Sequence, residues 1–510
     1  MPPLDVLFIP AAVLYVAILL TLVAYGVNFV WLTLVAARGR GRSPASVVPD
    51  QWPAVTVQLP VYNEMYVAER LVDAACRFEY PGRLEIQVLD DSTDETAEIV
   101  RRAVEAWRAR GVDVHQVRRS VRTGFKAGAL ANGLDLASGE LVAIFDADFI
   151  PAPDFLVRTV PVLCADDGLA FVQARWGHVN RGFSLLTFLQ SLSIDGHMVI
   201  EQFARWSAGQ WFNFNGTAGV WRLRALEDAG GWSQDTLTED LDLSYRAFLR
   251  GWRAAFLRDV ECLAELPVSY GAYRRQQHRW ARGSFECAIK HLPSVWRAPI
   301  GLRRKSQATF HLMGYSIHLM LLCLSLLYPI LLLSSVGQPQ AVTVFGIITL
   351  FNLTALAPPA LFTVAQHRLG RRWWAAIPGV LLLTILGAGM MANTGRAAWQ
   401  AIQGRPAVFE RTPKFGVGRE KVEWRKLRYQ PRFDGLVLVE AALAALDFAT
   451  AAAAVSRGTW AIAFYATLFG VGLTFSVALT CSQAARAAWI DRVSNRTGAV
   501  VAQPSPTPDA

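Results

Sequence analysis

The sequence is poor in charged residues and has no grouped cysteines. Asp, Glu, Lys and Arg make up 18% of the 510 residues and the mean hydropathy is +0.27, which is too apolar for an ordinary soluble protein and indicates membrane insertion. The six cysteines show no CxxC pairing and no histidine at zinc spacing, so they indicate small, reduced, hydrophobic side chains rather than a metal site. The formal charge of +9 lies mostly beside apolar stretches, which argues against a nucleic-acid partner.

Charge is almost missing from the first forty residues. Residues 4–37 contain one charged residue, Asp5, and are long enough to cross a hydrocarbon layer of about 30 Å. A cleaved signal peptide is the alternative, but the stretch is too long for one, has no basic segment before it, and ends at Arg38, Arg40 and Arg42. We therefore expect a transmembrane anchor over residues 1–38.

The second half of the chain predicts a membrane bundle. Residues 306–367 contain no Asp, Glu, Lys or Arg, and a Gly-Gln-Pro break at 337–339 divides them into two expected spans. Residues 403–432 carry nine Lys or Arg against three Glu, a net charge of +6, which places them in the cytosol by the positive-inside rule.

One apolar stretch conflicts with this topology unless it turns back. A single crossing at 373–394 would put the basic loop outside, so we expect a re-entrant or interfacial hairpin there, broken at Pro378, Gly387 and Gly389. Two further spans, near 435–455 and 460–481, give five crossings in all. The expected domains are the anchor (1–38), a cytosolic globular domain (51–302), a bundle with a cytosolic loop (306–485, loop 403–432) and a disordered cytosolic tail (486–510).

The globular zone alternates strand-like and helix-like segments. VTVQLPVYNE, LEIQVLDDS, VDVHQV and LVAIFDADF predict strands, and 68–78, 95–110 and 126–136 predict helices. This βαβ order indicates a largely parallel sheet, with a polar cluster after the carboxyl end of each strand, where such sheets bind ligands. Ser92 and Glu95 have the spacing of a capping box, which would start a helix directly after Asp90-Asp91.

Two acidic pairs stand at these strand ends. Asp146 and Asp148 suit a hard divalent cation, Mg²⁺ or Mn²⁺, that neutralises a leaving diphosphate; a simple loop cap is the alternative. Asp90 and Asp91 could accept the N–H groups of a nucleobase, or form a solvated turn. Lys126 begins a helix beside glycines and could contact phosphate, although taken alone it fits a solvated surface lysine better.

Two later motifs complete the candidates. Glu239 and Asp240 open a helix, which is common for capping reasons; as a functional residue, Asp240 would be the general base that deprotonates an acceptor hydroxyl. In RRQQHRWARG, Trp280 offers a flat face on which a sugar can stack, and Arg279 can pair with a diphosphate. Gln276 precedes Arg279 with two residues between them. A basic helix lying on the membrane accounts for the same pattern.

In order, VYNE, LDDSTDET, FKAGAL, FDADF, FNGTAGVWR, TED and QQHRW resemble the processive members of glycosyltransferase family 2. The likeness is greatest to cellulose-synthase-like glucomannan and xyloglucan backbone synthases and their bacterial relatives. It implies an α/β, Rossmann-like (GT-A) catalytic domain inserted between transmembrane helices, on a helical membrane bundle.

The resemblance also implies roles for individual residues. The residues implied to contact the nucleotide and the donor are Tyr62, Glu64, Asp90, Asp91, Lys126 and Asp146. Those implied to hold the metal are Asp146 and Asp148, and those implied to act in catalysis are Asp240 and Glu239. Acceptor and diphosphate contacts fall to Gln276, Arg279, Trp280, Asn215, Gly216 and Thr217. FERTPK resembles a gating loop, with Phe409, Thr412 and Lys414 as its matching residues and with Arg411 where the family pattern has Val.

These features lead us to expect an inverting, metal-dependent hexosyltransferase that uses UDP-glucose or GDP-mannose to extend a β-linked polysaccharide and is coupled to its export. The expected location is the cell (inner) membrane, multi-pass, with the catalytic domain cytoplasmic; export accessory proteins are left open. Transfer of a single sugar to a membrane lipid is the alternative, and a catalytically silent membrane scaffold is a rival from another class.

Overall fold

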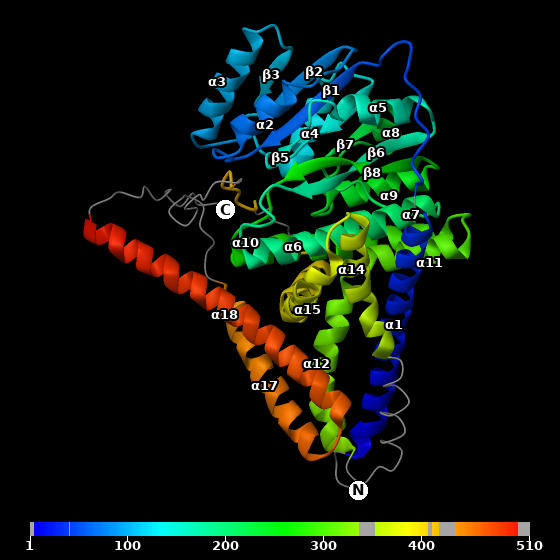
Figure 1. Cartoon of the computed structure of the whole chain (residues 1–510), viewed down its shortest axis with the longest axis vertical. Coiled ribbons are helices and arrows are strands. Elements are labelled where there is room, and N and C mark those ends of the chain that lie inside the picture. The colour runs from blue at the N-terminus through cyan, green and yellow to red at the C-terminus, as the bar shows by residue number, and fades with distance from the viewer. Residues whose placement is uncertain (1–4, 40, 336–351, 406–410, 418–433, 498–510) are drawn as a thin grey trace.

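The computed structural model describes residues 5–39, 41–335, 352–405, 411–417 and 434–497. Helix α1 (Asp5–Arg38) leads to an α/β domain that sits at one end of a helical bundle, and α10 (Tyr270–Arg297) lies between the two (Figure 1). This arrangement confirms the expected fold class, an α/β domain inserted between apolar helices.

The domain is built on one eight-stranded sheet. Its strands are β1 (Val55–Val61), β2 (Leu84–Asp90), β3 (Val114–Val117), β4 (Leu141–Ile144), β5 (Phe149–Ile150), β6 (Leu169–His178), β7 (Gly219–Arg222) and β8 (Arg253–Ala264), in the order β3-β2-β1-β4-β7-β6-β8-β5. The four strands expected from the sequence pair in parallel, and β7 then runs antiparallel to both β4 and β6. The sheet is therefore mixed: β3, β2, β1 and β4 run parallel, β6 and β8 form a second parallel pair, and β5 pairs antiparallel with β8.

The domain's helices are α2 (Ala68–Ala75), α3 (Thr96–Arg108), α4 (Phe125–Leu134), α5 (Phe155–Cys164), α6 (Leu185–Gly196), the π-helical η1 (His197–Gln202), α7 (Phe203–Ser207), α8 (Leu223–Asp228) and α9 (Glu239–Leu249). The three predicted helices form, but the capping box does not. Ser92 N–H instead donates to Asp90 and Thr96 N–H to Asp94. Aspartate side chains make these local turns readily, so α3 begins only at Thr96.

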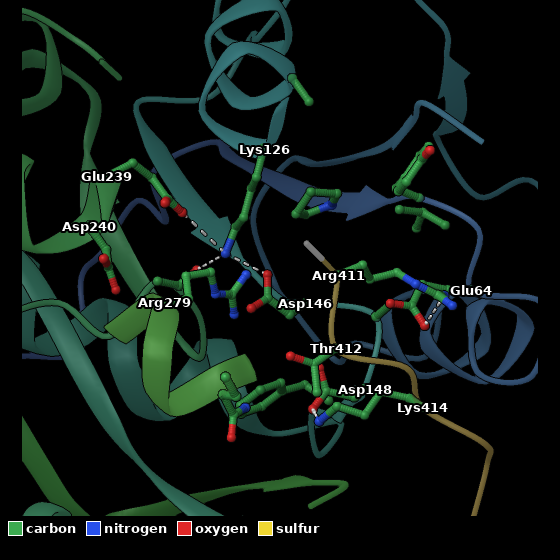
Figure 2. A pocket seen from close by; sticks show the side chains of 18 of the residues that line it. Glu64, Lys126, Asp146, Asp148, Glu239, Asp240, Arg279, Arg411, Thr412 and Lys414 are labelled. Atoms are coloured by element: carbon green, nitrogen blue, oxygen red, sulfur yellow. Dashed lines mark hydrogen bonds and ion pairs between the residues drawn. The ribbon is translucent and has the colours of Figure 1, made fainter. Parts of the chain in front are cut away.

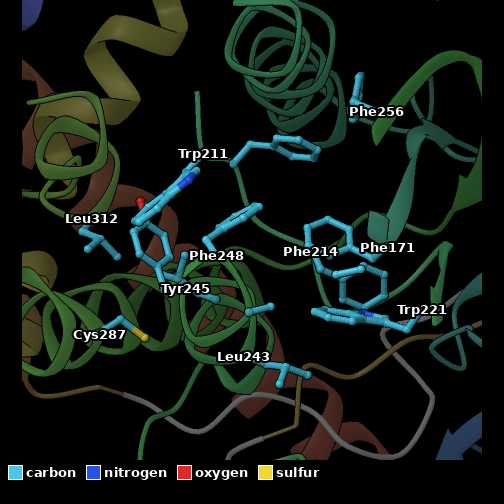
Figure 3. Packing of buried hydrophobic residues seen from close by; sticks show 14 of the residues in the cluster. Phe171, Trp211, Phe214, Trp221, Leu243, Tyr245, Phe248, Phe256, Cys287 and Leu312 are labelled. Carbon is cyan, nitrogen blue, oxygen red and sulfur yellow. The ribbon is translucent and has the colours of Figure 1, made fainter. Parts of the chain in front are cut away.

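An aromatic core fixes α9 against the sheet (Figure 3). Trp211 stacks on Phe248 of α9 at 5.4 Å between ring centroids, and Phe171 of β6 lies 4.6 Å from Trp221 of β7. Such rings bury large areas and pack with defined geometry. The first turn of α9, which carries Glu239 and Asp240, is therefore held at a set distance from the sheet.

The bundle consists of α1, α11 (Leu302–Leu312), α12 (Ser316–Ser334), the 3₁₀ turn η2 (Asn352–Leu356), α14 (Ala357–Arg368), α15 (Trp373–Gly389), α16 (Met391–Ile402), α17 (Leu436–Ser456) and α18 (Trp460–Thr497). Within the described ranges, four helices are long and apolar enough to cross a membrane: α1, α12, α17 and α18. The expected return span after 337–339 lies partly outside the described residues.

The stretch at 373–394 is not a hairpin broken at Pro378. Helix α15 continues through Pro378, and the break comes at Met390, after Gly387 and Gly389, where α15 and α16 meet at a bend of 44°. Pro378 is the sixth residue of α15 and lacks the backbone N–H of an interior helix position, yet the helix continues through it. The pair forms either a broken span or a re-entrant segment by length and composition.

Residues 411–417 pack against the sheet domain. The Phe415 N–H donates to Glu265 Oε1 at 2.8 Å, and Phe415 and Val417 are buried beside Val268. Arg371, just before α15, pairs with Asp195 of α6, and the Arg405 carbonyl, just after α16, accepts from Arg282 of α10. Both ends of the α15–α16 pair and this segment therefore belong to the end of the bundle that carries the sheet domain. In Figure 1, the turn between α17 and α18 lies at the opposite end.

This arrangement predicts the sides from which two positions can be labelled. In a Cys164→Ser background, which removes an exposed thiol of the sheet domain, Gln403→Cys should react with a membrane-impermeant maleimide only from the side of that domain. Ser456→Cys should react only from the other side, because the 21 residues of α17 span about 30 Å. Labelling of both positions from one side would contradict the predicted topology.

Candidate active site

One cavity of about 180 Å³ gathers most of the candidate residues (Figure 2). The predicted residues that line it are Tyr62, Glu64, Asp91, Lys126, Asp146, Asp148, Asn215, Gly216, Glu239, Asp240, Gln276, Arg279, Trp280, Thr412 and Lys414. Phe409 lies outside the described residues. Eight separate stretches of the chain thus meet near the carboxyl ends of β1, β2 and β4.

Lys126 lies at the centre of the cavity. Its Nζ is 2.6 Å from Asp146 Oδ1 and 3.6 Å from Glu239 Oε1, and it donates to the Gly216 carbonyl at 2.8 Å. Burial acts to lower the pKa of Lys126, but Asp146 and Glu239 outweigh it and raise the pKa above its ordinary value. The lysine is therefore a fixed cation that connects α4, β4 and α9.

Asp240 lies on the same side of the cavity as Glu239, facing Lys126 (Figure 2). Its Oδ1 accepts from the Leu241 N–H at 2.9 Å. Burial, assisted by the negative charge of Glu239 and opposed by Lys126, raises the pKa of Asp240 to about 7. A carboxylate with a pKa near the working pH suits a general base.

The two carboxylates of the Asp-x-Asp pair are held by different lysines. Asp146 pairs with Lys126, whereas Asp148 Oδ2 lies 2.5 Å from Lys414 Nζ. Lys414 also donates to the Glu265 carbonyl, and Arg411 lies 3.0 Å from Glu64. Burial raises the pKa of Glu64 to about 8, although Arg411 opposes this. Residues 411–414 thus close one wall of the cavity through ion pairs with buried acids.

Two arginines missed by the sequence analysis support Tyr62 and Asp91, which were predicted to contact a nucleotide. Arg119 binds Asp91 through two N–H groups, at 2.9 and 2.5 Å, and the Arg122 guanidinium lies 3.5 Å from the centre of the Tyr62 ring. Both precede the FKAGAL motif by a few residues, and this closeness in sequence is the signal that could have indicated them. They hold Tyr62 and Asp91 in place by charge and cation–π contact.

Two predicted contact residues lie behind the cavity wall. Asp90 is 1% exposed, and its carboxylate accepts from the Ser92 N–H and from Gln116. Thr217 is also buried, and its hydroxyl accepts from the Asp146 N–H at 2.9 Å. The polar atoms of both residues are used inside the protein, where they shape the turns that carry Asp91 and Asp146, and their predicted contact roles stay predictions.

The remaining wall comes from α10, which carries Gln276, Arg279 and Trp280 at helical spacing. Residues three and four apart lie on the same helix face, so the three side chains reach the cavity together. Gly283, one turn further, lies against Thr238 with no room for a Cβ atom. This close approach holds α10 beside the segment that leads into α9.

The carboxylates of Asp146 and Asp148 fit a divalent cation only if a bound substrate supplies further oxygen ligands to that cation. Among the described residues no group of three or more His, Cys, Asp or Glu side chains is arranged to hold a metal. Asp146 and Asp148 supply oxygen ligands, and Mg²⁺-type ions are typically bound by one or two carboxylates together with substrate phosphates. The donor set is therefore compatible with a metal that arrives with a diphosphate.

Residues 53–283 match the family model "Glycosyltransferase like family 2". Probable glucomannan 4-beta-mannosyltransferase 7 of Oryza sativa subsp. japonica is 38% identical over 392 residues, 73% of this chain and 64% of that protein. Glucomannan 4-beta-mannosyltransferase 7 of Arabidopsis thaliana is 48% identical over 237 residues, 46% of this chain and 43% of that protein. The chain thus spans less than two thirds of the length of either relative.

A solved mannosyltransferase, PcManGT from Pyrobaculum calidifontis in complex with GDP-Man and Mn²⁺, is 23% identical, with a TM-score of 0.49, and the match covers 78% of this chain and 100% of that one. The family match agrees with the GT-A fold class and the family resemblance expected from the motifs, and confirms both.

Gly216 offers a direct test of the cavity geometry. Its φ of +77° disfavours any side chain, and a Cβ atom there would lie 3.0 Å from Asp240 Oδ2 and 3.3 Å from Lys126 Nζ. Gly216→Ala should lower kcat at least about tenfold, since small misplacements of catalytic groups are costly. Steady-state kinetics would measure this.

The matched control is Gly209→Ala. Gly209 has a similar φ of +66°, but no atom lies within 4 Å of an added Cβ. Both variants should lose about 1–2 kcal/mol of unfolding free energy from backbone strain, with activity lost only at Gly216. If Gly209→Ala lost as much activity as Gly216→Ala, backbone strain alone would explain the loss.

Proposed function

Because residues 53–283 form a glycosyltransferase family 2 domain, we propose that this chain transfers a hexose from a nucleotide sugar to the end of a growing β-linked polysaccharide, with inversion at the anomeric carbon. The names of its relatives, glucomannan 4-beta-mannosyltransferases, favour GDP-mannose over UDP-glucose as donor. Coupled export of the product is part of the proposal, since the domain is inserted between helices that could cross a membrane.

The observation that carries the proposal is the meeting of donor-type and acceptor-type groups in one cavity. Lys126, Asp146 and Asp148 suit a diphosphate with its metal, while Trp280 and Gln276 of α10 suit a sugar. Asp240 lines the same cavity, beside Lys126 and Gly216. A silent scaffold would have no need to keep these ionised groups together in a buried place.

We assign the chemical step to a single displacement. Asp240 accepts the proton of the acceptor hydroxyl as its oxygen attacks the anomeric carbon, the bond to the diphosphate breaks, and an α-linked donor yields a β-linked product. Lys126, and Arg279 from the opposite wall, stabilise the negative charge that develops on the leaving diphosphate. Glu239 fixes the position of Lys126 and helps to keep the pKa of Asp240 high enough for it to act as a base.

Asp146 and Asp148 would hold the metal, Mg²⁺ or Mn²⁺, which supplies Lewis-acid neutralisation of the leaving group when bound. In the structure both carboxylates are instead paired with lysines. Lys126 and Lys414 thereby place one positive charge beside each carboxylate.

We also assign a gating role to the segment at 409–414. Arg411, Thr412 and Lys414 form part of the cavity wall. Movement of this wall would widen the cavity for a nucleotide sugar. Arg411, where the family pattern has Val, contributes the contact to Glu64.

The domain is proposed to face the cytoplasm of a cell membrane. The basic residues between 403 and 432 favour that side, and the described part of this stretch, 411–417, contacts the catalytic domain directly.

The base assignment predicts a change in pH dependence. With burial raising the pKa of Asp240 to about 7, kcat should rise about tenfold per pH unit below 7 and level off above it, because a protonated carboxyl cannot accept the acceptor's proton. Asp240→Asn should reduce transfer by a factor of about 10²–10⁴ while nucleotide affinity stays within about twofold.

The exposed Asp235, in the loop before α9, provides the matched control. Asp235→Asn should retain both the rate and the pH profile. Turnover in Asp240→Asn with an unchanged profile would place the base elsewhere.

The function itself is tested by incorporation of labelled sugar by the purified, detergent-solubilised protein, comparing GDP-mannose with UDP-glucose in Mg²⁺ or Mn²⁺. We expect a long, β-mannanase-sensitive polymer from GDP-mannose. Short products that extract into organic solvent would instead identify a lipid glycosyltransferase, and no transfer from either donor would refute the proposal.

A further inference from the structure

A buried polar cluster joins the first turns of α10 to the last two helices of the chain. Arg274 Nη2 lies 3.1 Å from Glu440 Oε1 of α17, and Arg274 Nη1 donates to Glu440 Oε2 at 3.2 Å and to Thr480 of α18 at 3.0 Å. The Tyr270 hydroxyl donates to Ser476 at 2.7 Å, and Ser476 donates to Glu440 at 3.1 Å. We refer to these five residues as the Arg274 clamp.

The charges of the clamp are deeply buried and balanced. The side chains of Arg274 and Glu440 are 3% and 0% exposed. Asp434, at the start of α17, lies 3.5 Å from Arg274 and pairs with Arg396 of α16 at 2.9 Å, so two cations face two anions. Buried ion pairs seldom add net stability over apolar residues of the same volume, whereas a role in fixing the register of helices is well attested.

Helix α10 carries the effect of the clamp to the cavity. Arg274 precedes Gln276, Arg279 and Trp280 by two to six residues on one continuous helix. A helix turns by about 100° and rises about 1.5 Å per residue, so a small slide or rotation at Arg274 moves these side chains by a comparable amount. Asn393 of α16 adds a hydrogen bond to the Arg274 carbonyl at 3.1 Å, which opposes such a slide.

The same helix also contacts the chain on both sides of the segment at the cavity wall. Arg282, two turns after Arg274, donates to the Arg405 carbonyl, and Arg274 itself pairs with Asp434. Thr412 and Lys414 lie between these two anchor points in sequence. The position of α10 therefore affects both the cavity wall that α10 forms and the attachment of the wall formed by residues 411–414.

We propose that Arg274 and Glu440 are positioning residues for the sugar-transfer reaction, an inference that rests on the proposed function. Their ion pair, formed within the apolar bundle, sets the height and rotation of α10 so that Gln276, Arg279 and Trp280 present the acceptor end to the donor. Neither residue lines the cavity, so each acts through α10 and not by contact with a substrate.

The test separates acceptor positioning from donor binding. Glu440→Gln keeps the shape of the side chain but removes its charge. In purified protein, kcat for chain extension should fall at least about tenfold, while the affinity for GDP or UDP, whichever the wild type binds, stays within about twofold in calorimetric titration. Arg274→Lys keeps a charge but loses the forked geometry, and its extension rate should lie between those of Glu440→Gln and the wild type.

Asp447→Asn is the matched control. Asp447 lies on the same helix, is equally buried, and accepts a hydrogen bond from Ser325 of α12 at 2.9 Å, away from α10. Its replacement should leave chain extension within about twofold.

Three results would overturn the inference: an unchanged extension rate in Glu440→Gln, a parallel loss of extension and nucleotide affinity, or an equal loss in Asp447→Asn. Absence of chain extension in the wild type would be a failure of the proposed function instead, so the two failures are distinguishable.

Discussion

The ammonium group of Lys126 is the interaction on which the candidate site depends. It joins the carboxylate after β4, the acidic start of α9 and the carbonyl of Gly216 in one buried place. Lys126 opposes the rise in pKa that burial causes at Asp146 and Asp240. The cation therefore lies between the proposed metal-binding carboxylate and the proposed general base.

The second constraint is mechanical, because the site is shared between a sheet domain and an apolar bundle. The sheet and the aromatic core behind α9 fix the donor wall and Asp240. The opposite wall belongs to α10 and residues 411–417, whose positions are set by contacts with the bundle and with Glu265. Relative motion of these two bodies would change the distance between the proposed donor and acceptor groups, so polar contacts at their junction bear on the proposed reaction.

Local patterns were sufficient for much of the fold. The alternating segments between 55 and 144 became the parallel half of the sheet, and the acidic pairs fell at strand ends as expected. Where the local patterns failed, a competing contact was available. Asp90 turned inward to its own loop instead of leaving Ser92 to cap α3, and Pro378 was accommodated in the first turns of α15. The antiparallel strands β7 and β5 depend on pairing across long sequence separations, which short patterns do not encode.

The sequence alone determined that the chain has long apolar helices, an α/β domain with acidic strand ends, and motifs in the order of family 2 glycosyltransferases, because hydropathy, periodicity and motif order are properties of neighbouring residues. Only the tertiary structure decided which polar groups meet. Arg411 pairs with Glu64, Lys414 with Asp148 and Arg274 with Glu440, and in each pair the two residues are more than 150 positions apart in the sequence. Burial accounts for such pairs, because a charge removed from water is costly in free energy unless a counterion lies beside it in the folded structure.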